Sequence, residues 1–171
     1  QTQDFFNERN ITVSDYPTAS VDGSIMLRVP GKHNVHNAKA ALAVARALEI
    51  PEEKAIRSLE NFAGTWRRFE FKGETATGVL VYDDYGHHPS EISSTLAAAR
   101  EKFPTQKIVV VFQPHLYSRT KEHVHEFGSA FGAADTVVLV PIYAAREPAD
   151  PSISSQILAE EVKKVSGRSK D

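Results

Sequence analysis

Residues 79–103 read VLVYDDYGHHPSEISSTLAAAREKF and contain a strand pattern, a polar loop and a helix pattern in direct succession. The run Val79–Tyr82 is apolar without alternation, which is typical of a strand covered on both faces. Pro89 suits the first turn of a helix, because its missing N–H is not needed there. Apolar residues then follow at helical spacing, namely Ile92, Leu96, Ala99 and Phe103. This stretch predicts a strand–loop–helix unit.

The alternation of strand and helix continues along the chain. Apolar runs at Ile108–Phe112 and Val137–Val140 predict two further buried strands. Helical spacing follows each of them, over residues 119–131 and 157–165. Strands without alternation that are separated by helices are typical of a parallel sheet with helices on both faces. The sequence therefore predicts that residues 67–171 form an α/β domain with an open, mostly parallel sheet.

The first part of the chain has a different pattern. Ile25, Leu27 and Val29 alternate along the chain and predict a short, half-buried strand. Residues 35–48 carry apolar side chains at helical spacing and are rich in alanine, the best helix former. Pro51 is suited to the start of a second helix. We interpret residues 1–66 as the end of a different domain.

Composition limits the classes of protein to which the chain can belong. The 171 residues carry 20 basic and 22 acidic side chains, a net charge of −2, so no global field would recruit nucleic acid or an anionic membrane. Cysteine is absent, which excludes a disulfide scaffold and a cysteine-ligated metal. No apolar run approaches the roughly 18 residues of a membrane span, and the first residues do not resemble a signal peptide. We expect a soluble, cytoplasmic protein that binds neither nucleic acid nor membrane.

Three polar loops follow the predicted parallel strands. They cover residues 83–89, 113–120 and 142–147, and they are rich in acidic, histidine, arginine and tyrosine side chains. In an open parallel sheet, ligands bind outside the carboxyl ends of the strands. Because all three loops leave such ends, we expect them to converge on one binding site.

The histidines do not predict a metal site. His87 and His88 are adjacent, so their side chains diverge, and His123 and His125 lie two apart in a predicted helix, where side chains do not face each other. Cysteine is absent and so is the His-Glu-x-x-His spacing of zinc enzymes. We therefore expect no metal ligands here, and we expect His123 and His125 to be surface residues.

Two polar pairs outside these loops could contact a nucleotide. Asn34 and Asn37 are three residues apart, so in the first turns of a helix they project to the same side. An asparagine amide offers a donor and an acceptor that match one edge of adenine. The alternative is that Asn34 only caps the helix. Arg67 and Arg68 could hold a phosphate, or they could be exposed charges in a linker.

Four blocks of the sequence, taken in order, resemble the Mur ligases of bacterial peptidoglycan synthesis. They are Gly31–Asn37, Phe62–Glu70, Asp83–Pro89 and Phe112–Thr120. The resemblance is nearest to the members that add L-alanine to UDP-N-acetylmuramate through an acyl phosphate, using ATP and Mg²⁺. Such cytoplasmic enzymes have three domains. The resemblance implies that residues 1–66 are the tail of the central P-loop ATPase domain and residues 67–171 most of the Rossmann-like C-terminal domain.

The resemblance also implies roles for individual residues. On the nucleotide side these are His33, Asn34, Asn37, Arg68 and Asp84. On the amino-acid side they are Tyr85, His87, His115 and Arg119. Some relatives carry an arginine where this chain has Leu116, which makes Arg119 the principal cation for the substrate carboxylate. The sequence contains no Gly-x-x-x-x-Gly-Lys-Ser/Thr loop, so we expect the chain to be inactive alone and assign no catalytic residue in it.

Two alternatives compete with this interpretation. A murein tripeptide-recycling ligase of the same superfamily tends to carry Phe-Ala where this chain has Tyr85 and Gly86. A non-catalytic nucleotide-binding module would not need the four residues Arg68, Asp84, His87 and Arg119 together. The sequence sets neither the oligomeric state nor the preference for alanine over serine or glycine, nor does it say whether the truncation is natural.

Overall fold

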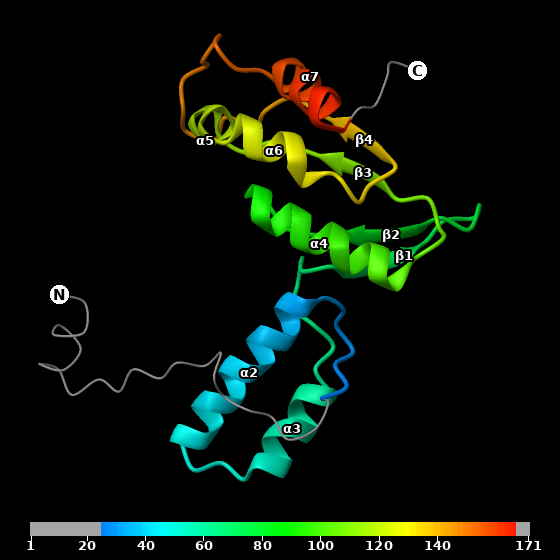
Figure 1. Ribbon diagram of the computed structural model, residues 1–171, viewed down its shortest axis with the longest axis vertical. Coiled ribbons are helices and arrows are strands. Elements are labelled where there is room, and N and C mark those ends of the chain that lie inside the picture. The colour runs from blue at the N-terminus through cyan, green and yellow to red at the C-terminus, as the bar shows by residue number, and fades with distance from the viewer. Residues whose placement is uncertain (1–24, 167–171) are drawn as a thin grey trace, which may run out of the picture. The chain divides into compact units, whose positions relative to one another are not determined.

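The computed structural model describes residues 25–166. The chain divides into two compact units, the first ending at Ala63 and the second beginning at Gly64 (Figure 1). The described part of the first unit is helical, and the second unit combines helices with strands. Within the described residues, no helix is both long and apolar enough to cross a membrane.

The first unit contains a pair of helices, α2 (Lys32–Ala47) and α3 (Glu52–Glu60). Gly31 precedes α2 with a φ of 99°, which glycine adopts without strain. The buried side chains of α2 are Ala38, Leu42 and Ala45. Across the connection, the Arg46 guanidinium donates to Glu52 Oε1 at 2.8 Å and ties the end of α2 to the start of α3. Both predicted helices are confirmed.

The predicted strand at Ile25–Val29 is wrong. The alternation itself is real, because Ile25, Leu27 and Val29 are partly covered while Met26 and Arg28 are exposed. Among the described residues, however, this segment pairs with no strand and has an irregular backbone. A strand needs partners for its N–H and C=O groups, and alternation alone does not supply them.

The second unit begins with a hairpin. Its strands β1 (Glu70–Glu74) and β2 (Leu80–Asp83) pair in antiparallel fashion. The Thr75 N–H donates to the Val79 carbonyl at 2.9 Å and closes the turn between them. Gly73 lies at a shift of the register and has a φ of 137°, a region that favours glycine. The hairpin sets the direction of β2, which leads into the first polar loop.

Helices and strands alternate in the rest of the unit, in the order α4 (Pro89–Lys102), β3 (Val109–Phe112), α5 (Tyr117–Glu122), α6 (Val124–Ala130), β4 (Thr136–Leu139) and α7 (Ser155–Ser166). β3 and β4 are parallel. The α/β class and this parallel pair are confirmed. The single helix predicted over residues 119–131 is instead two helices, because the chain is interrupted at His123, which ends α5 and precedes α6.

The predicted continuous sheet differs from the one observed. Within the described residues, β1 pairs with β2 and β3 pairs with β4, and no ladder joins β2 to β3. An open cavity of about 740 Å³ lies there instead, and its lining includes Leu80, Tyr82, Val109 and Val111. A strand pattern predicts an extended segment and its apolar faces, but pairing depends on residues that are distant in sequence.

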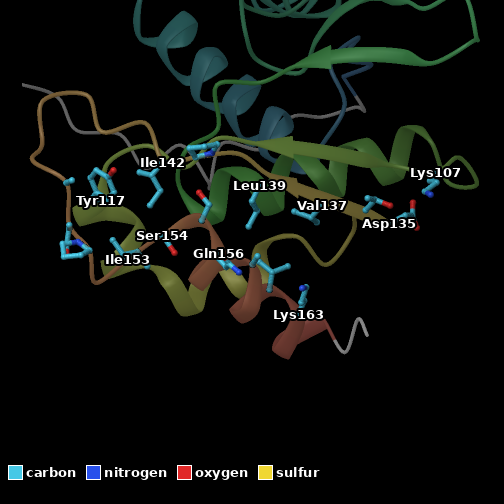
Figure 2. A pocket seen from close by; sticks show the side chains of 18 residues that line it. Lys107, Tyr117, Asp135, Val137, Leu139, Ile142, Ile153, Ser154, Gln156 and Lys163 are labelled. Carbon is cyan, nitrogen blue, oxygen red and sulfur yellow. The ribbon is translucent and has the colours of Figure 1, made fainter. Parts of the chain in front are cut away.

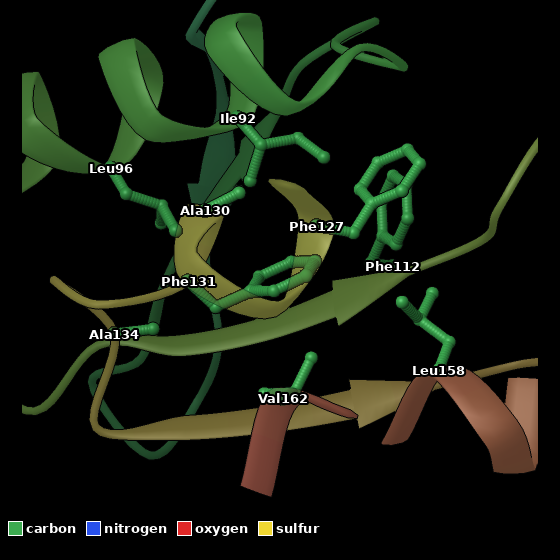
Figure 3. Packing of buried hydrophobic residues seen from close by; sticks show 9 residues of the cluster. All are labelled: Ile92, Leu96, Phe112, Phe127, Ala130, Phe131, Ala134, Leu158 and Val162. Carbon is green, nitrogen blue, oxygen red and sulfur yellow. The ribbon is translucent and has the colours of Figure 1, made fainter. Parts of the chain in front are cut away.

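Helices pack on one face of the β3–β4 pair, not on both as predicted. The core there joins α4, α6 and α7 to the sheet (Figure 3); it consists of Ile92, Leu96, Phe112, Phe127, Ala130, Phe131, Ala134, Leu158 and Val162. On the other face of the strands, the open face, Val109, Val111 and Val138 are 55%, 68% and 44% exposed. The described residues therefore leave one apolar face of the sheet uncovered, and helical spacing in the sequence does not specify which face a helix covers.

Candidate functional site

The three polar loops approach one another at the carboxyl ends of the strands. The second and third loops are joined by backbone hydrogen bonds. The Leu116 N–H donates to the Tyr143 carbonyl at 2.9 Å, and the Tyr143 N–H donates to the Pro114 carbonyl at 2.8 Å. The first loop joins them through His87, whose ring centre lies 6.3 Å from that of His115. The predicted convergence of the three loops is confirmed.

Four rings from these loops form a row, which we call the ring row: Tyr85, His87, His115 and Tyr143. The outer pairs, Tyr85–His87 and His115–Tyr143, have ring centres 5.4 Å apart. Tyr85 and Tyr143 are 50% and 54% exposed, so both can border a small ligand. Tyr143 was not among the predicted site residues, although its place in a loop after a parallel strand was the available signal.

Arg119 lies against the ring row through His115. Its Nη1 is 3.3 Å from His115 Nδ1, and because a guanidinium only donates, Nδ1 is the acceptor. Burial, followed by the charges of Arg119 and His87, lowers the pKa of His115, and Glu147 opposes this in part. The imidazole is therefore neutral near pH 7 and carries its proton on Nε2. Arg119 and that Nε2–H are two donors suited to a carboxylate.

Glu147 holds the start of α5, the helix that carries Arg119. Its carboxylate accepts hydrogen bonds from the Ser118 hydroxyl and from the Ser118 N–H, the latter at 3.0 Å. The Ser118 hydroxyl, followed by the N–H, keeps the pKa of Glu147 below its ordinary value. Leu116, just before α5, has a φ of 71°, a conformation that costs a non-glycine residue about 1–3 kcal/mol. Sequence reasoning missed Glu147, because nothing local marks it as the partner of Ser118.

Asp84 organises the first loop. Its Oδ2 accepts from the Phe69 N–H at 2.8 Å, and its Oδ1 accepts from the Gly86 N–H at 2.7 Å. A Cβ on Gly86 would lie 2.8 Å from that same Oδ1, so a larger residue here would require the Asp84 side chain to shift. Both carboxylate oxygens keep further lone pairs. The nucleotide contact predicted for Asp84 therefore stays a prediction.

The two adjacent arginines have different surroundings. Arg67 Nε donates to Asp83 Oδ2 at 3.0 Å, and its guanidinium carbon lies 4.9 Å from the centre of the Tyr85 ring. Arg68 is half exposed, and its Nη1 lies 3.6 Å from Glu91 Oε1. Arg67 thus supports the first loop, whereas Arg68 has access to a ligand. Sequence reasoning missed Glu91, because an acid in the first turn of a helix has an ordinary explanation in the helix dipole.

The residues predicted to contact adenine lie in the first unit. Asn34 Nδ2 donates to the Pro30 carbonyl at 2.7 Å, and Asn37 Nδ2 donates to Asn34 Oδ1 at 3.5 Å. The two amides are therefore on the same side of α2, as their spacing predicts. Asn34 is not the cap of the helix, because α2 begins directly after Gly31. His33 is exposed beside them.

Two other histidines were predicted to be surface residues. His125 is 82% exposed and its Nδ1 lies 2.8 Å from Glu161 Oε1, so the prediction is confirmed for it. The His123 side chain is only 25% exposed, and its ring packs edge-on against His88 with centres 4.8 Å apart. His123 is therefore partly buried between α4 and the α5–α6 break.

A larger cavity lies between β4, α7 and the segment that joins them (Figure 2). Its volume is about 1360 Å³, and Val137, Leu139, Ile153 and Gln156 are among the residues that line it. None of the predicted site residues belongs to its lining. We therefore locate the candidate site at the ring row, where donors and rings converge, and not at the larger hollow.

Comparison with known proteins gives a consistent result. Residues 67–170 match the family described as Mur ligase, glutamate ligase domain. A UDP-N-acetylmuramate–L-alanine ligase from Trichlorobacter lovleyi is 50% identical over 142 residues, which cover 83% of this chain and 31% of that protein. The chain spans about a third of the length of the curated relatives that it matches.

Solved structures show the same relationship. The UDP-N-acetylmuramate–alanine ligase of Thermotoga maritima superposes with a TM-score of 0.66 at 34% identity, covering 81% of this chain and 29% of that one. A murein peptide ligase from Psychrobacter arcticus superposes with a TM-score of 0.50 at 29% identity, covering 69% of this chain and 26% of that one.

Proposed function

This chain belongs to the Mur ligase family, and on that premise we propose that it is the C-terminal part of a ligase that joins L-alanine to UDP-N-acetylmuramate with cleavage of ATP. Relatives named for this reaction are 50% and 48% identical to the chain. The product would be a precursor of bacterial peptidoglycan. We expect the reaction in the cytoplasm, where both nucleotide substrates are found.

The observation that carries the proposal is the ring row with Arg119 beside it. An amino acid presents a carboxylate, an amine and a side chain to its site. Arg119 Nη1 and the Nε2–H of His115 are donors for the carboxylate, and the ring of Tyr85, half exposed, limits the room for the side chain. By holding the carboxylate and bordering the side chain, these residues would fix the direction in which the amine points.

Orientation is the main contribution expected from this unit. In the proposed reaction the sugar carboxylate attacks the γ-phosphate of ATP, which gives an acyl phosphate and ADP. The amine of alanine, once its ammonium form has lost a proton to solvent, then attacks the acyl carbon. Phosphate leaves as the amide bond forms, and the nitrogen gives up its second proton to the departing phosphate or to solvent. Holding the amine close to the acyl carbon, away from water, favours amide formation over hydrolysis of the intermediate.

The nucleotide would be shared with other parts of the parent enzyme. We propose that residues 1–66 are the tail of its central ATPase domain, with His33, Asn34 and Asn37 near adenine. Arg68 and Asp84 would reach the nucleotide from the second unit. Mg²⁺ is expected to accompany ATP, but the described residues gather no group of three metal-binding side chains, and we assign none of them to the metal.

Phosphate release by the full-length parent tests the proposal. With ATP and UDP-N-acetylmuramate present, we expect release to depend on L-alanine. Dependence on a murein tripeptide in place of alanine would instead support the recycling ligase. Nucleotide binding without any release, under conditions where the protein is folded, would support a non-catalytic module. The 171-residue chain alone is not suitable for this assay, because it contains no P-loop sequence.

A further inference from the structure

We propose that Glu91 is a positioning residue that links the nucleotide contact Arg68 to the amino-acid contact His87. The inference rests on the function proposed above. Glu91 lies in the first turn of α4, and its Oε2 accepts the N–H groups of His87 at 2.9 Å and of His88 at 3.1 Å. Its Oε1 lies 3.6 Å from Arg68 Nη1. One carboxylate therefore contacts both sides of the candidate site.

The geometry exceeds what a helix cap requires. Capping needs one acceptor for the free N–H groups at the start of α4, and Glu91 provides that acceptor with Oε2 alone. The other oxygen faces Arg68, which comes from a different segment of the chain. In addition, Oε2 lies 3.6 Å from His87 Nδ1, whose nearer partner is the Tyr85 carbonyl oxygen at 3.1 Å, so the charge of Glu91 acts on the ring from a longer distance than on the backbone.

Glu91 is ionised at neutral pH. Burial raises the pKa of its carboxyl, but the N–H donors of His87 and His88, with the charges of His87 and Arg68, outweigh this and leave the pKa below its ordinary value. The side chain is 33% exposed, so solvent screens its charge less than that of a fully exposed acid. The carboxylate is therefore an anion shared between the Arg68 guanidinium and the backbone of the loop at His87.

Sharing of one anion couples the two binding sites. When a nucleotide phosphate attracts Arg68, Glu91 loses that partner, and its carboxylate then interacts more strongly with the N–H groups of His87 and His88. The loop that carries the His87 ring is thereby held more firmly in place for the amino acid. Bound nucleotide should then increase the affinity for alanine. By thermodynamic linkage, alanine should increase the affinity for nucleotide by the same factor.

The test measures alanine binding to the full-length parent by calorimetry, with UDP-N-acetylmuramate present throughout, and with and without a saturating non-hydrolysable ATP analogue. In the wild type we expect the analogue to raise alanine affinity by about fivefold or more, the lower end of ordinary coupling. Glu91→Gln keeps an acceptor oxygen for the two N–H groups but loses the charge. In this variant, the factor by which the analogue raises alanine affinity should fall below about twofold. Glu101→Gln is the matched control, an exposed acid on the same helix, and it should keep the wild-type factor.

Each other outcome has a definite meaning. If Glu91→Gln keeps the wild-type factor, Glu91 is only a cap, and the proposal is wrong. If the wild type binds alanine equally with and without nucleotide, the link is wrong but the proposed function stands. If the wild type binds no alanine in either condition, the proposed function itself fails. Thermal unfolding of the same variants shows whether a loss of coupling between nucleotide and alanine is caused by unfolding of the protein. Glu91→Ala would unfold the protein, whereas Glu91→Gln should not.

Discussion

Two regions of the second unit differ in whether their side chains have partners. One is the edge where the three polar loops meet, which we call the loop edge, and the other is the open face of the sheet. At the loop edge, the carboxylates of Asp84, Glu91 and Glu147 accept backbone N–H groups and hold the loops in place. On the open face, apolar side chains such as Val111 have no cover among the described residues. Exposed apolar surface of this kind marks a contact surface. The described residues therefore organise the candidate site through their own hydrogen bonds, whereas one apolar face of the sheet stays uncovered among them.

The largest expected effect is the complete absence of ligase turnover by the 171-residue chain. The site can be organised and still be inactive, because no P-loop lysine is present to bind the phosphates of ATP. The measurement is phosphate release with ATP, UDP-N-acetylmuramate and alanine, using the isolated chain. Turnover by this polypeptide would refute both the interpretation as part of an enzyme and the assigned roles.

The next largest expected effect is a difference in stability between substitutions on the two faces of the sheet. Phe127 is 1% exposed in the core, so Phe127→Ala should lower the free energy of unfolding by about 3–5 kcal/mol. Val111 is 68% exposed on the open face, so Val111→Ala should change it by less than about 0.5 kcal/mol. Chemical unfolding of both variants measures the difference. Equal losses would mean that the open face is covered in solution.

Arg68→Ala in the full-length parent should affect function and spare the fold. Arg68 is half exposed and contacts Glu91 at a distance of 3.6 Å, so little of the core depends on it. Loss of a charge-assisted contact corresponds to a decrease in ATP-dependent turnover of about tenfold to a hundredfold. Lysine should substitute poorly, because it lacks the planar fork. If Arg68→Ala instead melts the protein while folded molecules turn over normally, the residue is structural.

The smallest expected effect is a pH-dependent change in stability at Asp150. The hydroxyl and then the N–H of Ser152, followed by Lys121, lower the pKa of Asp150 to about 2. A carboxyl whose pKa is lower in the folded state stabilises the fold at pH values above its pKa in the unfolded state, which is about 4. That stability is lost as the pH falls through the pKa in the folded state. Asp150→Asn should therefore melt at a slightly lower temperature than the wild type at pH 7, and the difference should vanish between pH 4 and pH 2. A difference that is the same at every pH would contradict the assignment.

Local patterns predicted most of the elements but not their pairing. Helical spacing found α2, α4 and α7, and apolar runs found β3 and β4, because both signals are carried by neighbouring residues. The pattern at Ile25–Val29 predicted a strand for which the described residues supply no partner. Likewise, the apolar sequence runs that predicted β2 and β3 carry no information about the cavity that separates these strands. Pairing is decided by contacts between residues distant in sequence.

The candidate site was predictable where topology determines it. The loops that carry Tyr85, His87, His115 and Arg119 follow the carboxyl ends of strands, so their convergence could be expected from the sequence pattern alone. Glu91 and Glu147 could not be found in this way. Each acts by accepting an N–H group from a loop backbone, and a sequence does not show which carboxylate reaches which N–H.

Arg119→Ala in the full-length parent tests the central claim, that the loop edge holds the amino acid. The measurement compares the apparent affinities for alanine, ATP and UDP-N-acetylmuramate in the variant with those in the wild type. Lys121→Ala, which removes a cation from the same helix, is the control. We predict that Arg119→Ala weakens alanine binding about tenfold to a hundredfold and leaves the other two affinities unchanged. An unchanged alanine affinity, or an equal loss for all three substrates, would contradict the account.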